Sequence, residues 1–187
     1  MKNLLSVKNL RVSFNTYAGE VKAVRGVDFE LASGETLAFV GESGCGKTVT
    51  AKALLRLHQP PFAVIKEGSQ ILFDGQDVMQ MNKKQLQQYR GNEASMIFQD
   101  PMTSLNPTMT CGKQIMEGLI LHRGMDKARA RDAAIETLRL VKIPDPEKRA
   151  DDYPHQLSGG MRQRVMIAIA LACQPKLLIA DEPTTAL

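Results

Sequence analysis

The chain has 187 residues, 43% hydrophobic and 24% charged, so it is long enough for one domain with a sizeable core. Its net charge of +4 is mild and its basic residues are scattered, which is typical of a solvated surface and compatible with an acidic partner or a membrane surface. The three cysteines form no metal-ligand spacing and predict reduced thiols in a cytosolic protein. We expect neither a signal peptide nor a membrane span, because no apolar run approaches the ~18 residues a span needs, so any membrane role must come through a partner.

The N-terminal third of the chain predicts strands followed by a helix. Short β-rich segments at 5–14 and 21–31 partly alternate apolar and polar residues, as strands with one buried face do. Residues 36–40 form a continuous apolar segment, which predicts a strand covered by helices on both faces. A glycine-rich loop and a helix over 47–57 are expected to follow, and Pro60-Pro61 closes this unit.

The middle of the chain changes from short strands to helices. We expect strands at 70–73 and 95–98, with a polar helix over 83–90 between them. From 110 to 142 the apolar residues recur with a helical period. The apolar stripe of this helical block consists of Ala130, Ala134, Leu138 and Val141.

The end of the chain predicts a buried helix and a buried strand. Residues 160–173 are apolar nearly all round from Val165 onward, which is typical of a helix inside the protein. The apolar strand 177–180 follows. The layout is therefore a β-rich start, an α/β core and a helical insert.

The first of three phosphate-handling motifs is Gly41-Glu-Ser-Gly-Cys-Gly-Lys47-Thr48, which fits G-x-x-x-x-G-K-[ST] at every fixed position. Its glycines let backbone N–H groups curl around phosphate oxygens, and the start of the following helix adds its dipole. Lys47 is expected to reach the β- and γ-phosphates, and Thr48 to place its hydroxyl on Mg²⁺. The other loop residues expected to bind nucleotide through their backbone are Gly41, Gly44, Cys45 and Gly46. The Cys45 side chain is either a small tolerated group or a reactive thiol at a helix N-terminus.

The second motif, Leu157-Ser158-Gly159-Gly160, opens the buried helix. Ser158 has the side chain of an N-cap residue, so an ordinary capped helix would explain it. Two consecutive glycines weaken a helix start unless something must approach the backbone closely. A γ-phosphate that docks on this N-terminus supplies such a reason.

The third motif places Asp181 and Glu182 at the C-terminal edge of a buried strand, where ligands bind in open α/β sheets. Asp181 is expected to support Mg²⁺, directly or through water. Glu182 is expected to orient or deprotonate the attacking water. Many strand ends could mimic this pair, and the phosphate loop earlier in the chain is what makes it specific.

With these motifs in this order, the whole chain resembles the nucleotide-binding subunit of an ATP-binding cassette (ABC) transporter, above all those of bacterial dipeptide, oligopeptide and nickel importers. The stretches most similar to that subfamily are Met96–Pro107, Tyr153–Arg164 and Ala180–Leu187. The resemblance implies an α/β fold with a P-loop NTPase (RecA-like) core, an N-terminal antiparallel β subdomain and an inserted helical subdomain, incomplete at the C-terminus. It divides one domain into 1–100 (β subdomain plus P-loop core), 101–156 (helical insert) and 157–187 (signature helix and Walker B strand).

The resemblance also assigns roles that the residues alone do not reveal. Gln99 would sense Mg²⁺ and the attacking water while contacting the transmembrane partner. An aromatic residue near the start of this family stacks on adenine; Tyr17 is our choice and Phe14 the alternative, although packing would explain either ring. Val49 replaces a common hydroxyl residue, so one α-phosphate contact would fall to its backbone.

The family mechanism implies two such domains facing head to tail, identical or paralogous, with each ATP held between one phosphate loop and the other domain's signature. Hydrolysis of ATP to ADP and phosphate would drive two transmembrane permease subunits, which receive a peptide, nickel or another solute from a periplasmic or lipoprotein solute-binding protein. The chain would then lie peripherally at the cytoplasmic face of the bacterial inner membrane, with no nucleic acid as partner. The signature residues that would contact the partner's nucleotide are Ser158, Gly159, Gly160 and Met161, the last standing where the general signature has Gln.

A soluble ATPase of the same superfamily, acting in DNA repair or translation, is the alternative from another class. Repair members interrupt the cassette with long coiled coils or cysteine clusters, whereas a short helical insert separates Gln99 from Ser158 here. Translation members usually carry two cassettes per chain. The resemblance further implies a D-loop aspartate directly after Leu187 and a switch histidine beyond it, so we expect residues 1–187 alone to be inactive.

Overall fold

The computed structural model describes residues 3–58 and 60–183, which form two compact units. The first unit ends at Leu86 and the second begins at Gln87. Of the transporter-like stretch at 180–187, residues 184–187 lie outside the described part of the chain. Within the described part, no helix has both the length and the apolar character to cross a bilayer.

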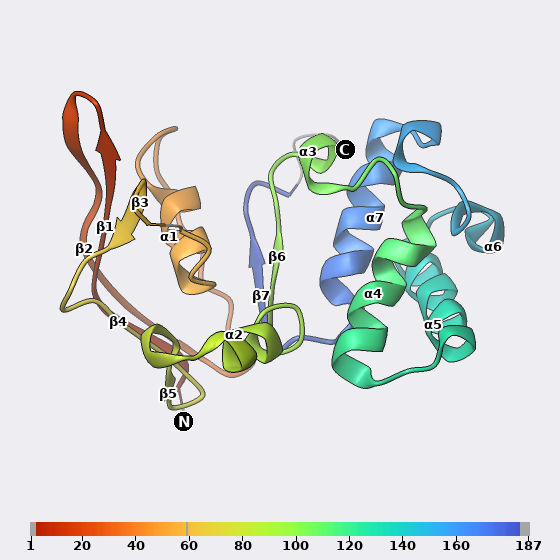
Figure 1. Cartoon of the computed structure of the whole chain (residues 1–187), viewed down its shortest axis with the longest axis horizontal. Helices are drawn as coiled ribbons and strands as arrows, with labels where there is room; N and C mark the ends of the chain where they lie inside the picture. The colour runs from red at the N-terminus through yellow and green to blue at the C-terminus, as the bar shows by residue number, and fades with distance from the viewer. Residues whose placement is uncertain (1–2, 59, 184–187) are drawn as a thin grey trace. The chain divides into compact units, whose positions relative to one another are not determined.

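The first unit is built on a long antiparallel hairpin of β1 (Asn3–Thr16) and β2 (Gly19–Ala32), at the two positions where alternation predicted strands (Figure 1). On its other side β1 pairs antiparallel with β3 (Ala63–Ile65) and β4 (Gln70–Phe73), and β5 (Gln76–Asp77) pairs with β4. Among the strands that the structure describes, β2 therefore lies at one edge of the sheet. The register between β1 and β2 shifts at four places.

The core of the first unit follows from the period of β1. Its inward residues Leu5, Val7, Leu10 and Val12 are at most 1% exposed. Helix α1 (Lys47–Leu54) contacts both β1 and β2 and buries Ala51, Ala53 and Leu54. Each fully buried aliphatic side chain of this kind contributes about 2 kcal/mol through the area removed from water. A 3₁₀ turn, η1 (Val78–Gln80), follows β5.

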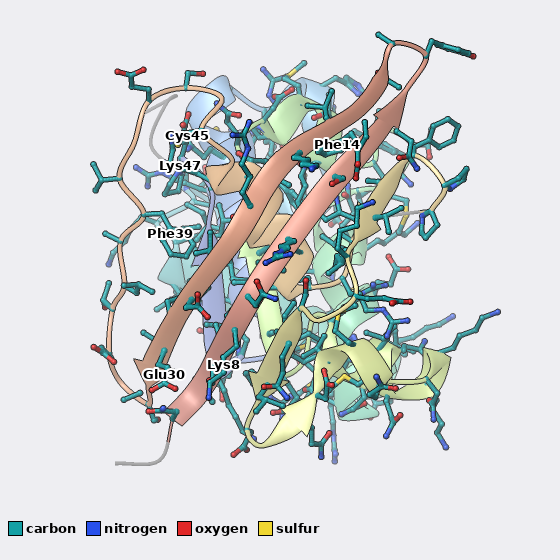
Figure 2. The ribbon with its side chains drawn as sticks, turned by 90° about the vertical axis from the view of Figure 1, so that its left-hand side faces the viewer. Lys8, Phe14, Glu30, Phe39, Cys45 and Lys47 are labelled. Carbon is teal, nitrogen blue, oxygen red and sulfur yellow. The ribbon has the colours of Figure 1, made fainter. Side chains whose placement is uncertain are left out.

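The strand predicted at 36–40 is wrong. Residues 35–42 have no regular secondary structure, and the Val40 side chain is 95% exposed. A strand exists through its ladder of backbone hydrogen bonds, and no described strand of the first unit pairs with this segment. The Phe39 ring instead packs edge-to-face on Phe29 of β2, with ring centroids 5.1 Å apart (Figure 2).

The helix predicted over 47–57 ends earlier, at Leu54. Arg56 has a left-handed backbone with φ of 50°, which a continuing α-helix cannot contain. Its guanidinium donates to the carbonyls of Val78, Met79 and Met81 at 2.9–3.2 Å. These three bonds tie the end of α1 to the chain around η1.

The second unit combines a parallel strand pair with a helical cluster. β6 (Ala94–Ile97) and β7 (Leu177–Ala180) pair in parallel, with Ala94 opposite Leu177 and Ile97 opposite Ala180. Helix α2 (Lys83–Tyr89) runs from the first unit into the second. The remaining helices are α3 (Pro101–Ser104), α4 (Cys111–Arg123), α5 (Lys127–Leu140), α6 (Pro146–Arg149), the 3₁₀ turn η2 (Pro154–Gln156) and α7 (Gly159–Leu171).

Helix α7 is the central element of the second unit. It contacts β6, α3, α4 and α5, and Figure 1 shows α4, α5 and α7 side by side. This position explains why its sequence is apolar nearly all round, as predicted. The α5 stripe faces the same core: Ala130, Ala134 and Leu138 are fully buried, while Val141 is half-buried just past the helix.

Candidate functional site

The phosphate loop lies at the start of α1 in the first unit, where the G-x-x-x-x-G-K-[ST] pattern predicted it. Lys47 folds back over the loop, and its Nζ donates to the carbonyls of Gly41 at 2.8 Å and Glu42 at 2.9 Å. Figure 2 shows Lys47 and Cys45 together at this turn. The ammonium group therefore sits across the loop that would wrap the phosphates.

Gly46 is the residue at which the loop most needs glycine. It is the N-cap of α1, with a left-handed φ of 95°. A Cβ added there would lie 2.9 Å from the backbone oxygen of Ala23 in β2. The loop can thus lie against β2 only because position 46 has no side chain.

Of the neighbouring loop residues, Cys45 is exposed, while Thr48 and Val49 are half-buried. The Cys45 sulfur lies 3.9 Å from Lys47 Nζ. The Val49 carbonyl lies 2.8 Å from Nε2 of His58. The loop thus presents one thiol to solvent.

In the second unit, the ends of β6 and β7 bring together two residues that are 83 positions apart in sequence. Gln99 follows β6 by two residues, Glu182 follows β7 by two residues, and Gln99 Nε2 donates to Glu182 Oε2 at 2.7 Å. Between β7 and Glu182, the Asp181 side chain is buried and its backbone N–H donates to the Ile97 carbonyl at 2.9 Å. Three predicted site residues therefore lie at one edge of this strand pair.

Glu182 has an unusual backbone. Its φ is 49°, in the left-handed region that non-glycine residues rarely occupy. Such residues persist where their surroundings hold them, and they concentrate at functional sites. The hydrogen bond from Gln99 is one of the contacts that hold the Glu182 carboxylate.

The signature motif forms the exposed N-terminus of α7. Ser158 is the N-cap, and its Oγ accepts a hydrogen bond from the Met161 N–H at 3.3 Å, as the capping pattern predicted. Ser158 and Gly159 are exposed, and a Cβ added at Gly159 would meet no atom within 4 Å. Gly160 and Met161 are half-buried in the first turn. The helix start is therefore open to an anion, which its free N–H groups and dipole would favour.

Each unit carries oxygen groups that suit a hard cation. The hydroxyl of Thr48, the carboxylate of Asp181 and the amide oxygen of Gln99 are oxygen ligands of the kind Mg²⁺ prefers. Gln99 uses its amide nitrogen for Glu182, which leaves its oxygen for another partner. Thr48 and the phosphate loop belong to the first unit, and the other residues belong to the second.

The candidates for adenine stacking differ in their surroundings. Tyr17 lies in the turn between β1 and β2 with a fully exposed ring. Phe14 is half-buried in β1 and packs edge-on against His58, with centroids 5.8 Å apart. The assignment of Tyr17 stays a prediction.

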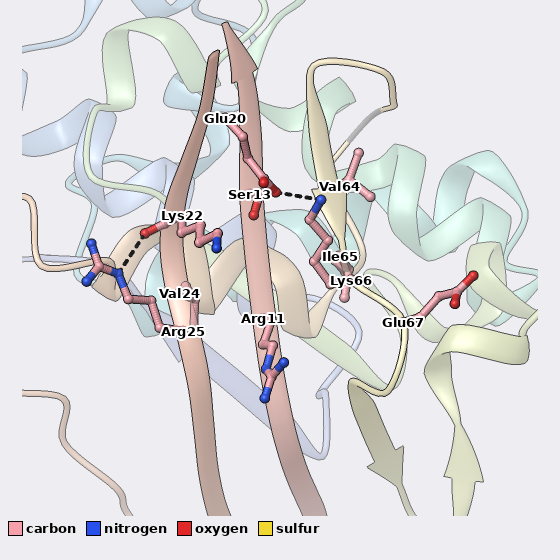
Figure 3. Close-up of a pocket in the computed structure, with 10 residues that line it drawn as sticks. All are labelled: Arg11, Ser13, Glu20, Lys22, Val24, Arg25, Val64, Ile65, Lys66 and Glu67. Carbon is pink, nitrogen blue, oxygen red and sulfur yellow. Dashed lines mark hydrogen bonds and ion pairs between the residues drawn. The ribbon is translucent and has the colours of Figure 1, made fainter.

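A groove of about 880 Å³ is lined by β1, β2, β3 and the residues after β3 (Figure 3). Lys66 and Glu20 form an ion pair of 2.6 Å in it. Hydrogen bonds from Lys66 and Ser13 lower the pKa of Glu20. No phosphate-loop residue is among the described residues that line this groove, so it is separate from the phosphate site.

Gln163 is a site candidate that sequence reasoning missed. It is wholly buried in α7, and its Nε2 donates to the carbonyl of Pro183, the residue after Glu182. The available signal was one uncharged polar residue in the interior of a helix predicted to be buried. Helical periodicity alone did not say that this residue faces the chain beyond β7.

Comparison with known proteins gives consistent matches. A family model described as ABC transporter matches residues 24–185. The oligopeptide transport ATP-binding protein OppD of Bacillus subtilis is 59% identical over 184 residues, which are 98% of this chain and 51% of that protein. The dipeptide transport ATP-binding proteins DppD of Bacillus subtilis and Lactococcus lactis are 55% and 58% identical over the whole chain, which covers 56% and 53% of them. The chain thus spans about half the length of the curated relatives it matches.

Solved structures show the same likeness. The ATP-binding cassette MJ0796, in a dimeric post-hydrolysis state bound to ADP and Pi, superposes with a TM-score of 0.85 at 28% identity. The match covers 98% of this chain and 75% of that chain. A second dimeric structure of MJ0796, described as a bacterial ABC transporter cassette, matches equally well. The predicted α/β cassette fold with its antiparallel β subdomain is therefore confirmed.

Proposed function

The chain belongs to the ABC transporter family, whose cassettes bind ATP, and on that premise we propose that it is the ATP-hydrolysing part of a peptide importer. The observation that carries the proposal is the hydrogen bond between Gln99 and Glu182 beside the buried Asp181. It supports a hydrolytic centre at the end of β6 and β7, with a base, a polar sensor and a metal carboxylate. The relatives are named for oligopeptide and dipeptide transport, which favours peptides over nickel as the solute.

The first steps assigned to the chain's residues are binding and charge compensation. Lys47 exchanges its two carbonyl partners for the β- and γ-phosphate oxygens, while the loop N–H groups hold the phosphates from the other side. The Thr48 hydroxyl and the Asp181 carboxylate are the groups that would hold Mg²⁺, which would neutralise negative charge on the phosphates.

The chemical step is an attack by water on the γ-phosphorus. Glu182 accepts the proton of this water as the new oxygen–phosphorus bond forms and the bond to the β-phosphate oxygen breaks, which releases ADP and phosphate. For this, the Glu182 oxygen must be released from the Gln99 amide. Gln99 would then turn its amide to the water and Mg²⁺.

The open start of α7 is assigned to a second cassette. Ser158, Gly159 and Gly160 are accessible and present a helix N-terminus, which suits the γ-phosphate of a nucleotide held by the partner. The dimeric state of the similar cassette MJ0796 supports this arrangement. Two transmembrane permease subunits and a periplasmic or lipoprotein solute-binding protein complete the proposed importer, with this chain at the cytoplasmic face of the membrane.

The test of the proposed function is Glu182→Gln in the intact protein. Loss of the base should lower kcat by about 10²–10⁴-fold, while ATP affinity stays near the wild-type value. Glu67→Gln is the matched control, since Glu67 is an exposed carboxylate outside the three motifs. Steady-state hydrolysis and equilibrium ATP binding measure the two quantities. Hydrolysis by the Glu182 variant within a few-fold of wild type would rule out this assignment.

A further inference from the structure

Gln163 is an uncharged polar side chain in the apolar interior of the second unit. It is 0% exposed, and the α7 residues that share its burial are Val165, Met166, Ala168 and Ala170. Helix α7 places its first turn at the signature and its following turn against the chain that leaves β7. Gln163 is the side chain through which the helix reaches that chain.

The contact is a hydrogen bond from Gln163 Nε2 to the carbonyl oxygen of Pro183. Pro183 directly follows Glu182, so this bond fixes the peptide next to the proposed base. Proline has no backbone N–H, so its carbonyl is the polar group that the residue offers. The amide therefore holds position 183 through that group.

The same amide is a poor choice for stability alone. Its oxygen Oε1 is buried without a hydrogen-bond partner among the described residues. A buried acceptor left without a partner costs free energy, whereas an apolar side chain of similar size would fill the same space without that cost. What the amide adds over an apolar residue is a directed bond to Pro183.

That directed bond acts where the backbone is strained. Glu182 has its left-handed φ of 49° between β7 and Pro183. Its side chain is bonded by Gln99, and the carbonyl that follows it is bonded by Gln163. The two amides hold Glu182 from two sides, one through the carboxylate and one through the main chain.

We propose that Gln163 is a positioning residue for Glu182, which sets the direction of the carboxylate by anchoring the Pro183 carbonyl to the signature helix. The inference rests on the proposed function, in which Glu182 is the base. It also joins Ser158 and Glu182 through one rigid helix. A displacement of α7 would therefore reach the base of the same chain.

The first test is Gln163→Met in the intact protein, with hydrolysis and ATP binding measured together. A misplaced base should lower kcat by about 10–100-fold while the KM for ATP stays within about twofold. Val165→Ala is the matched control, because Val165 is equally buried in α7 but carries no polar group. It leaves a small cavity in the core and keeps the bond to Pro183 intact, so its kcat should stay near wild type even though its thermal stability falls.

The second test is Gln163→Glu, which keeps the shape of the side chain. A buried carboxyl is protonated well above its ordinary range, and its O–H can then donate to the Pro183 carbonyl. Its kcat should be close to wild type at low pH and should fall as pH rises and the acid ionises. Wild type and Gln163→Met should lack this pH step. A purely structural role would not create it.

The outcomes separate this inference from the function on which it rests. If wild type hydrolyses no ATP, both proposals are overturned. If wild type is active and Glu182→Gln is not, but Gln163→Met keeps its kcat, only the positioning role is overturned. An equal kcat loss in Gln163→Met and Val165→Ala, or a pH profile of Gln163→Glu parallel to wild type, also overturns it.

Discussion

At the residue scale, Gly44 and Gly46 make different demands on the phosphate loop. Both have left-handed backbones, with φ of 82° and 95°. A Cβ at Gly44 would meet no atom within 4 Å, whereas one at Gly46 would approach the backbone of Ala23. A side chain at Gly44 would therefore meet only backbone strain, whereas one at Gly46 would meet backbone strain and a steric clash.

Gly46→Ala should weaken ATP binding far more than Gly44→Ala. Both changes carry the left-handed penalty of about 1–2 kcal/mol. Only the first also overpacks the loop against β2, which costs about 1–3 kcal/mol more and corresponds to roughly 5- to 150-fold in affinity. Titration with ATP, together with thermal unfolding, measures both. Equal affinities in the two variants would contradict the close approach to Ala23.

Some of this site could be predicted from the sequence at the residue scale. The phosphate loop is a local pattern, so its place before α1 followed directly from Gly41 to Thr48. Gln99 and Glu182 each follow a recognisable strand, but their contact depends on the register of β6 with β7. Register is set by packing across the whole sheet, and a single strand does not encode it. The bond of Gln163 is equally non-local.

At the scale of elements, Gln114 braces the segment between α3 and α4. Its side chain bonds the N–H and the carbonyl of Asn106 at 2.9 and 3.0 Å, and also the carbonyl of Met109 at 3.0 Å. Residues 103–116 follow Gln99 and belong to the proposed helical insert, where a permease helix would dock. One side chain thus orders the stretch in which we expect a permease helix to dock.

Gln114→Ala in the intact transporter should uncouple hydrolysis from transport. Three hydrogen bonds are lost, together about 2–3 kcal/mol of local stability. ATP affinity should remain near wild type, because the phosphate loop belongs to the other unit. Solute uptake and ATP hydrolysis, both measured in reconstituted vesicles, give the amount of solute transported per ATP hydrolysed. Glu117→Ala, an exposed change on the same helix, is the control. Loss of nucleotide binding with coupling intact would assign this segment to the nucleotide site instead.

Elements were predictable where their period was long and their partners were near. The β1–β2 hairpin and the stripe of α5 show this, since 14 residues each give a clear pattern. The prediction of a strand at 36–40 failed because an apolar run indicates burial only. A strand also needs a hydrogen-bonding partner, which no local pattern reveals. β3 and β5 were missed because two or three residues carry no period, and α3 and α6 because four residues are too few to show a helical period.

At the scale of the whole molecule, the three cysteines report on folding. Cys45 is exposed, whereas Cys111 and Cys173 are buried. Burial raises the pKa of the Cys111 thiol to about 11, and it also raises the pKa of Cys173. Because the thiolate is the reactive form, burial and the raised pKa both protect these two thiols from reagents in the native state.

A thiol reagent at pH 8 should modify Cys45 first, and ATP should slow that reaction by covering the loop. The two buried thiols should react only on unfolding, where their pKa returns to about 8.5. Since the folded pKa of Cys111 is raised, its contribution to stability is complete below about pH 8.5 and declines as pH rises toward 11. Mass spectrometry of labelled peptides checks the order of labelling, and urea unfolding midpoints from pH 7 to 10 check the pH dependence of stability. Early labelling of Cys111 in native protein would contradict its burial.

The edge position of β2 has a consequence for the protein in crowded solution. An edge strand exposes unpaired backbone groups and can recruit a strand of another molecule into an aggregate. Four register shifts against β1 and the left-handed Gly26 interrupt the regular geometry that such recruitment needs. Exposed charges at Lys22, Arg25 and Glu30 further raise the free-energy cost of pairing β2 with a strand of another molecule. These features of the irregular hairpin disfavour pairing of the 14-residue edge strand with a strand of another molecule.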